Sequence, residues 1–149
     1  MRLNSEQFLK VAKEAADIAL ESFSDPWSFS SFTSLCKSNN SCFYFFAEFD
    51  ESSKMLAYLI FSVVEDTAEV LDIAVKSTHR KQGIGEKLLN ESFVFAKENR
   101  VSVIFLEVRE SNLPARTLYE KLGFFVSGKR RNYYENPAED AVLMSKLLT

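Results

Sequence analysis

Histidine and cysteine are scarce in this sequence, and their scarcity argues against metal and thiol chemistry. His79 is the only histidine, and Cys36 and Cys42 are the only cysteines, among 149 residues. Structural zinc sites take four ligands, mostly cysteine and histidine, at short spacings, and no such cluster occurs here. In a reducing compartment, two cysteines are more often small hydrophobic residues than a disulfide. We therefore expect no metal, no disulfide and no catalytic role for His79.

Long apolar runs and strong charge are also missing. No run of roughly 18 apolar residues is present, as a membrane-spanning helix would require, and residues 1–23 lack the apolar core of a signal peptide. The formal net charge is -3 at pH 7, which offers no electrostatic reason to bind nucleic acid. We expect a cytoplasmic protein with no membrane or nucleic-acid partner.

Linkers and repeats are absent as well. The chain has only four glycines and three prolines, and no low-complexity or repeated segment divides it. Hydrophobic residues make up 46% of the sequence, an ordinary fraction for a globular protein. We predict one domain over residues 1–149, present as a monomer or a weak dimer.

Apolar residues spaced by three and four predict four helices. The first covers residues 5–23 with Ser5 as its N-cap, and a short second helix ends near Cys36. The third follows Gly83 and carries an apolar stripe for the core. The fourth is short and lies within residues 111–125.

Runs rich in apolar residues predict a short first strand and six further strands, over residues 42–49, 55–64, 69–75, 101–108, 124–131 and 140–148. The first three of these six follow one another across short polar breaks and should form an antiparallel meander. The nearly unbroken apolar run at 101–108 is typical of a central strand covered on both faces. The expected fold class is α/β, of the α+β kind: a mixed, mostly antiparallel central sheet flanked by about four helices.

Two of the four glycines stand two residues apart in "RKQGIG", between a strand and a helix. Unpaired N–H groups at a helix start bind phosphate groups, and glycines there let an anion approach the backbone. Alternatively, Gly83 and Gly85 only permit a tight turn, and Arg80 and Lys81 are solvated. The hexapeptide alone leaves both interpretations open, although it lacks the Gly-Lys-Ser/Thr ending of a P-loop.

Together with its neighbours, the motif resembles the GCN5-related N-acetyltransferase (GNAT) superfamily. The stretches that carry the resemblance are "LDIAV", "RKQGIG" and "LEVRESNLPARTLYEKLGF". The resemblance implies that acetyl-CoA is the cosubstrate. It also implies that the cofactor is bound by Ile73, Ala74, Val75, Lys81, Gln82, Gly83, Ile84, Gly85, Glu86 and Asn112.

Further stretches, "DPWS" and "KRRNYYENPAEDAVLM", are similar to the branch of the superfamily that acetylates the N-terminal alanine of a small-subunit ribosomal protein. The resemblance implies a ternary complex in which the peptide amine attacks the thioester directly. Glu107 matches the catalytic base of the family and Tyr119 its general acid. The alternatives are a GNAT enzyme for another protein N-terminus, a lysine or a small amine, or a module that binds acetyl-CoA without chemistry.

The residues themselves are compatible with these roles. An α-amino group has a reference pKa of about 7.7–8.0, so a base must remove a proton before the amine attacks. Glu107 interrupts a mostly apolar strand, which is unexpected unless it faces an open site. Without the family pattern, an ion pair between Glu107 and Arg109 and a core position for Tyr119 are the simpler interpretations.

The C-terminal aromatic pair also allows two interpretations. "RRNYY" could be an exposed turn between the last two strands. Alternatively, Tyr133 and Tyr134 bind the acceptor peptide, with Glu135, Glu139 or Asp140 attracting its amine. We expect Trp27 to pack as a core residue rather than to bind a ligand.

Overall fold

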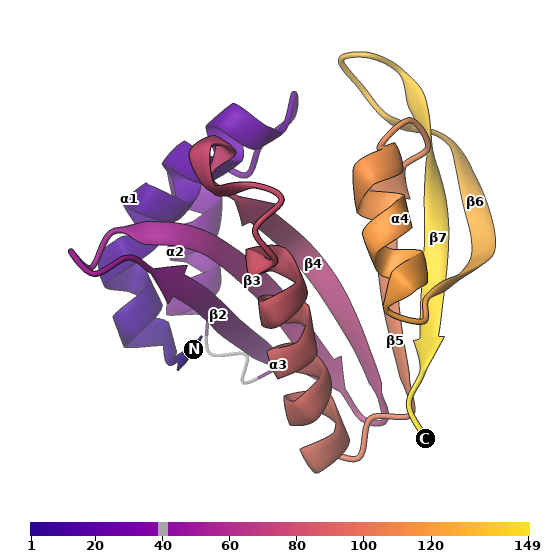
Figure 1. Ribbon diagram of the computed structural model, residues 1–149, viewed down its shortest axis with the longest axis horizontal. Coiled ribbons are helices and arrows are strands. Elements are labelled where there is room, and N and C mark those ends of the chain that lie inside the picture. The colour runs from indigo at the N-terminus through magenta and orange to yellow at the C-terminus, as the bar shows by residue number, and fades with distance from the viewer. Residues whose placement is uncertain (39–41) are drawn as a thin grey trace.

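The computed structural model describes residues 1–38 and 42–149, which form one mixed seven-stranded sheet with four α-helices (Figure 1). The strand order is β1-β2-β3-β4-β5-β7-β6, and every neighbouring pair is antiparallel except β4 and β5. This confirms the expected fold class. The helices are α1 (Ser5–Ser22), α2 (Phe29–Lys37), α3 (Ile84–Glu98) and α4 (Leu113–Lys121), with a 3-10 turn η1 (Ser77–His79) before α3. The strands are β1 (Arg2–Leu3), β2 (Phe43–Phe49), β3 (Met55–Val64), β4 (Thr67–Val75), β5 (Val103–Arg109), β6 (Phe125–Tyr134) and β7 (Glu139–Leu147).

Helix α1 begins at Ser5, and its N-cap is Asn4 rather than the predicted Ser5. The Gln7 N–H donates to Asn4 Oδ1 at 2.8 Å, and the Asn4 N–H donates to Gln7 Oε1 at 2.9 Å. This reciprocal pair needs a glutamine or glutamate three residues after the cap. From Ser5 that position is Phe8, whose side chain is fully buried and has no polar group.

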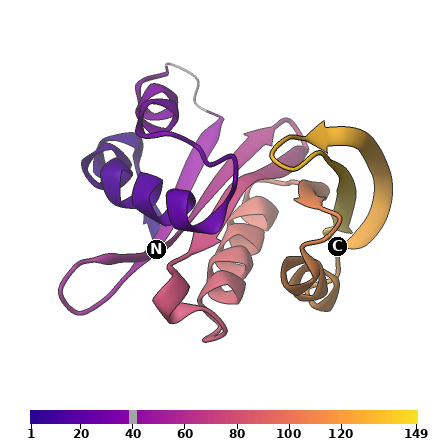
Figure 2. The same ribbon diagram turned by 90° about the horizontal axis from the view of Figure 1, so that it is seen from above.

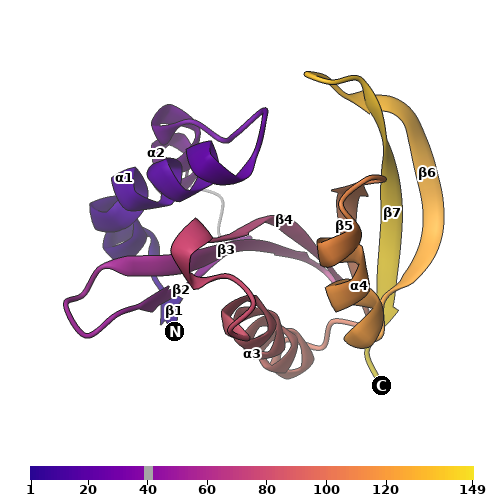
Figure 3. The ribbon, with the colours of Figure 1, turned by 45° about the horizontal axis from the view of Figure 1, so that its top comes forward.

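Helices α1 and α2 cover one face of strands β1 to β4, where aromatic rings fill the space between helix and sheet (Figure 3). Phe8 of α1 stacks on Phe45 of β2 with ring centroids 4.7 Å apart. Phe32 of α2 meets Tyr58 of β3 edge-on at 5.3 Å, and Trp27 lies 5.4 Å from Phe32. Trp27 is therefore a core-packing residue, as expected.

Helices α3 and α4 lie side by side against the opposite face of the sheet, where α3 packs on β2, β3 and β4 (Figure 2). Leu88 and Leu89 of α3 are fully buried there with Ile104 of β5. The end of α4 is set by Gly123, whose φ of +93° is the left-handed conformation that glycine adopts without strain. The sheet is thus covered on both faces at one end only. No described helix is both long and apolar enough to cross a membrane.

Strand β5 is covered on one face, not on both as its apolar sequence suggested. Ile104, Leu106 and Val108 are buried, whereas the alternate Phe105 is 43% exposed. The reason is that α1 and α2 reach only across β1 to β4. The open face of β5 therefore displays Phe105, Glu107 and Arg109, which follow one another at the two-residue period of a strand.

Strands β4 and β5 run parallel for a short distance and then separate (Figure 1). Their pairing joins residues 67–70 with residues 103–106. Beyond it, residues 71–75 of β4 and 107–109 of β5 are not paired with each other. We call these two diverging segments the β4–β5 fork.

Candidate active site

The glycine motif forms the entrance to α3 at the β4–β5 fork. Gly83 is the N-cap, with a φ of +80°, and no heavy atom lies within 4 Å of the position that a Cβ would take. The Lys87 N–H donates to the Gly83 carbonyl at 3.0 Å, so the N–H groups of residues 84–86 have no acceptor within the helix. The structure of Gly83 fits both the tight turn and the anion site that the sequence suggested. The turn needs its positive φ, and the open backbone leaves room for an anion.

The charged side chains around this helix start are not all solvated. Arg80 does not lie free beside the glycines: its Nε donates to the Val75 carbonyl at 3.1 Å and its Nη2 to Ser22 Oγ at 3.0 Å. Arg80 thus ties the loop to α1 and β4, while Lys81 is exposed. Glu86, in the first turn of α3, forms an ion pair with Lys121 of α4 at 2.8 Å.

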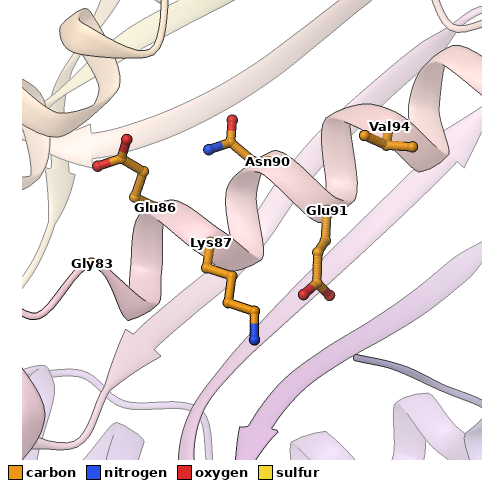
Figure 4. Close-up of a pocket in the computed structure, with 6 residues that line it drawn as sticks. All are labelled: Gly83, Glu86, Lys87, Asn90, Glu91 and Val94. Atoms are coloured by element: carbon orange, nitrogen blue, oxygen red, sulfur yellow. The ribbon is translucent and has the colours of Figure 1, made fainter.

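A shallow depression of about 550 Å³ runs from Gly83 along the outer face of α3 (Figure 4). Its lining residues are Gly83, Glu86, Lys87, Asn90, Glu91 and Val94. Lys87 is already paired with Glu48 at 2.9 Å. The depression therefore continues the open surface of the glycine motif along α3.

The edge of β4 that faces the fork is not paired with β5 beyond residue 70. The Lys76 N–H donates to the Leu56 carbonyl at 2.8 Å. Since backbone groups alternate in direction along an antiparallel strand, Ile73 and Val75 point theirs away from β3. Ala74 between them points its own toward β3, where it pairs with Tyr58. An extended ligand could pair there with the Ile73 carbonyl and the Val75 N–H, because the Val75 carbonyl already accepts a hydrogen bond from Arg80 Nε and the Ile73 N–H already binds the Asp72 carboxylate.

Asn112 caps α4 on the other side of the fork. Its Oδ1 accepts the Ala115 N–H at 3.3 Å. The side-chain carbonyl of Asn112 therefore holds the start of the helix. The side-chain NH2 group is left to contact a cofactor. Its predicted cofactor contact stays a prediction.

Glu107 lies on the open face of β5 and is paired with Arg130 of β6, not with Arg109. Its Oε1 is 3.1 Å from Arg130 Nε, and 19% of the Glu107 side chain is exposed. Arg109 binds Glu139 instead, at 3.2 Å. The suggested ion pair within β5 is wrong because Glu139 of β7 and Arg130 of β6 offer closer partners across the sheet.

Tyr133 and Tyr134 lie at the end of β6 rather than in a turn, and both interact with Glu107. Their rings meet edge-on at 5.1 Å. The Glu107 charge, aided by burial and a hydrogen bond to Glu107, raises the pKa of Tyr133. Burial, with the Glu107 charge second, raises the pKa of Tyr134 to about 12. Strand β6 thus brings Tyr133 and Tyr134, which were predicted to bind the acceptor peptide, close to Glu107, the predicted base.

Tyr119 of α4 has its ring in the core and is 7% exposed. Burial raises the pKa of its hydroxyl, and the charge of Asp72 and the neighbouring Tyr134 add to the effect. The Tyr119 hydroxyl therefore holds its proton more tightly than a free phenol does. The core interpretation of Tyr119 is correct for the ring, and it does not conflict with a role for the hydroxyl.

Asp72 is a site residue that the sequence analysis missed. It lies in the β4 arm of the fork, and Tyr58 donates its hydroxyl proton to Asp72 Oδ2 at 2.8 Å. Burial raises the pKa of Asp72 to about 6. Its position inside "LDIAV", among apolar residues, is the signal that could have identified it.

Glu69 is a second carboxylate that the sequence analysis missed. It stands in the paired part of β4, opposite Phe105 in the register. Burial first, and the Glu107 charge second, raise the pKa of Glu69, while Arg130 opposes them. The charges of Glu107 and Arg130, which pair with each other, therefore both act on Glu69. The alternation that singled out Glu107 in β5 applies equally to Glu69 in "AEVLD".

Two of the three acidic residues expected to attract the amine, Glu139 and Asp140, are engaged within the protein. Glu139 Oε2 accepts the Ser111 N–H at 2.6 Å, in addition to its pair with Arg109. Asp140 accepts the Asn132 N–H at 2.8 Å and lies 3.3 Å from Lys129. Glu107 and Glu69 are therefore better placed than these residues to meet a cationic amine on the open face.

Comparison with known sequences gives one consistent result. The sequence profile of the Acetyltransferase (GNAT) family matches residues 12–124. The ribosomal protein bS18-alanine N-acetyltransferase of Escherichia coli (strain K12) is 38% identical over 122 residues, or 80% of this chain and 80% of that protein. The enzyme of that name from Haemophilus influenzae is 37% identical over 123 residues, or 80% of this chain and 81% of that protein.

Comparison with solved structures agrees. The crystal structure of the ribosomal-protein-S18-alanine N-acetyltransferase from Escherichia coli has a TM-score of 0.86 at 32% identity, and the match covers 100% of this chain and 95% of that one. Arabidopsis thaliana NAA60 in complex with acetyl-CoA has a TM-score of 0.83 at 17% identity, covering 99% and 97%. The second likeness concerns the fold alone.

Proposed function

The chain belongs to the Acetyltransferase (GNAT) family, and we propose that it transfers acetyl from acetyl-CoA to the N-terminal alanine of ribosomal protein bS18. The acceptor is that of the relatives, which share 38% and 37% identity with this chain over 80% of its length. The observation that supports the chemistry is that Tyr133 and Tyr134 both interact with Glu107, and that Tyr134 also interacts with Tyr119.

Acetyl-CoA enters this proposal as the donor substrate. The open backbone at Gly83 and the N–H groups of residues 84–86 suit its pyrophosphate. The unpaired edge of β4 at Ile73 and Val75 suits the amide-bearing pantetheine arm, which can pair with it as a strand does. Lys81 and Gln82 are exposed beside the motif and complete the phosphate side.

The base acts on the attacking amine, and the acid acts on the departing sulfur. Glu107 accepts a proton from the α-ammonium group, directly or through water, and the neutral amine attacks the thioester carbonyl. The C–N bond forms as the carbonyl becomes tetrahedral, and the C–S bond then breaks. Tyr119 donates its hydroxyl proton to the departing sulfur, which avoids a thiolate charge in a mostly apolar setting. The positively charged nitrogen of the intermediate loses its second proton as the amide forms, and that proton returns to Tyr119, directly or through water, while Glu107 releases its own proton to solvent after the product leaves.

The pair of Glu107 with Arg130 bears on how the acceptor binds. A substrate ammonium carries the same charge as the guanidinium and needs the same carboxylate. Arg130 is 56% exposed on its side chain, so it can move into solvent when the amine arrives. The Arg130 guanidinium also lies 5.4 Å from the centre of the Tyr133 ring. This cation–π contact can hold Arg130 when the substrate amine takes its place beside Glu107.

The test is acetylation of a peptide that carries the N-terminal sequence of bS18, followed by intact mass and by release of the CoA thiol. We expect one acetyl group on the free peptide and none on the same peptide with a blocked α-amine. Glu107→Gln should lower kcat roughly 10²-fold or more while acetyl-CoA binding persists.

Glu110→Gln is the matched control, because Glu110 is a glutamate three residues further on whose carboxylate binds Lys129 at 2.7 Å. It should keep wild-type activity. Acetylation of the blocked peptide at a lysine would redirect the assignment to another amine. Tight acetyl-CoA binding without transfer to either peptide would support a binding module instead.

A further inference from the structure

Arg109, the last residue of β5, contacts two segments that lie far from it in the sequence. Its Nη1 donates to the Pro137 carbonyl at 3.0 Å and to Glu139 Oε1 at 3.2 Å. Its Nη2 donates to the Glu135 carbonyl at 2.7 Å and to Ser24 Oγ at 3.1 Å. One guanidinium therefore joins the connection between α1 and α2 to the turn between β6 and β7.

We call this group of contacts the Arg109 clasp; it comprises Ser24, Asp25, Arg109, Glu135, Asn136, Pro137 and Glu139. Within it, Asn136 Nδ2 donates to Asp25 Oδ1 at 3.2 Å, and Asp25 Oδ2 lies 3.7 Å from Arg109 Nη2. The same two segments are thus joined twice. Figure 3 shows them approaching each other above the β4–β5 fork.

The clasp depends on the shape of the arginine side chain. A guanidinium has five N–H donors in one plane, and here that plane serves four acceptors. Its centre also lies 4.5 Å from the centre of the Tyr134 ring. A lysine could keep the charge but has three donors around a single nitrogen, so it cannot reproduce this set.

The location of the clasp connects it with the acceptor. Arg109 follows Glu107 by two residues, so both side chains lie on the same face of β5. Tyr134, under the guanidinium, is itself acted on by the Glu107 charge. The glycine motif and the β4 edge contribute no residue to the clasp.

We propose that Arg109 is a positioning residue for the acceptor peptide: it holds the α1–α2 connection and the β6–β7 turn together beside Glu107, and so sets how the peptide amine approaches the base. This inference rests on the proposed function. It assigns to Arg109 no contact with acetyl-CoA and no proton transfer.

The first test is a steady-state comparison of wild type with Arg109→Gln and Arg109→Lys on the bS18 N-terminal peptide. Losing several hydrogen bonds to a charged group should raise the KM for the peptide roughly 10-fold or more in both variants. The KM for acetyl-CoA should stay within about twofold, because the residues that suit acetyl-CoA lie outside the clasp.

Lys129→Gln is the matched control. Lys129 pairs with Glu110 at 2.7 Å and Asp140 at 3.3 Å, and so joins β6 to its neighbours without reaching the α1–α2 connection. It removes one positive charge from the same end of the sheet and should leave both KM values unchanged.

A second variant opens the clasp with Arg109 in place. Asn136→Asp puts a carboxylate against Asp25, and the like charges should push the two segments apart. The KM for the peptide should rise in the same direction, less so at high salt because exposed charges are screened. Hydrogen exchange in residues 23–28 and 135–138 should quicken in this variant and in Arg109→Gln.

The outcomes separate the two proposals. If wild type acetylates no bS18 peptide, the proposed function fails and the inference fails with it. If wild type is active and the KM for the peptide is unchanged while exchange quickens in the clasp, the clasp does not position the acceptor and only the inference is overturned. An equal rise in both KM values would make Arg109 a general structural residue, which also overturns it.

Discussion

The two ends of the sheet differ in how they are covered, and the chemistry follows that difference. Strands β1 to β4 have α1 and α2 on one face and α3 on the other, whereas β5, β7 and β6 have α4 on one face only. The closed end is rich in fully buried aromatic rings, among them Phe8, Phe45 and Tyr58. The open end carries Glu107, Arg109 and Arg130, whose charges need solvent or partners. One end therefore supplies stability and the other supplies the reactive groups.

The largest effect expected from this comparison is on stability. Phe8→Ala, in the closed end, removes a ring that is 0% exposed and should cost about 3–5 kcal/mol of unfolding free energy. Phe105→Ala, in the open end, removes a ring that is 43% exposed and should cost about 1 kcal/mol. Urea unfolding of both variants makes the comparison, and equal losses would contradict it.

The next effect is on catalysis. Tyr119→Phe keeps the buried ring and removes the hydroxyl, so kcat should fall roughly 10²-fold while the unfolding midpoint changes little. Tyr44→Phe is the matched control: Tyr44 lies in β2 of the closed end, where its ring packs 4.5 Å from Phe95. If both variants lose activity alike, the hydroxyl of Tyr119 has no special role.

Asp72 gives a pH-dependent effect at the boundary between the two ends. Its pKa rises from 3.8 to about 6 in the folded protein, so stability from the protonated form is present below pH 3.8 and lost as the pH rises through about 6. Asp72→Asn keeps an acceptor for Tyr58 and carries no charge. At pH 8 it should be more stable than wild type by up to about 3 kcal/mol.

At pH 4 the advantage of Asp72→Asn should largely disappear, since Asp72 is then mostly protonated in the folded wild type. The measurement is urea unfolding of both proteins at the two pH values. A difference that does not change with pH would mean that packing, and not charge, distinguishes the two side chains.

The smallest effect lies wholly within the closed end. Asn4→Ala removes the side-chain half of the capping box and should cost about 1 kcal/mol. Ser5→Ala, at the position that the sequence suggested as the cap, should change the unfolding free energy by a few tenths of a kcal/mol at most. Thermal unfolding of the two variants distinguishes the caps.

Much of the fold could be predicted from local patterns, because helix and strand periodicities are written into neighbouring residues. The four helices and the positions of the seven strands along the chain were predicted in this way. The extent of β6 was not: its polar "RRNYY" looks like a turn, yet pairing with β7 holds it as a strand up to Tyr134. The exposed face of β5 was also missed, since burial depends on which helix lies above a strand.

Parts of the candidate site could be predicted for a similar reason. Gly83 lies in a local motif, and its positive φ and open surroundings agree with the prediction. The partners of the charged residues could not be predicted, because ion pairs join residues distant in sequence. Arg80 binds α1 instead of being solvated, and Arg109 binds Glu139 of β7 instead of Glu107.

The sequence by itself determined the elements, the apolar stripes and the glycine turn before α3, since each depends on residues within a few positions of one another. Only the tertiary structure decided which carboxylates meet which guanidinium groups and which tyrosines lie near Glu107. The separation of β4 from β5 and the curvature of the open end bring those groups together. Electrostatic energies depend on distances and burial that no local pattern specifies.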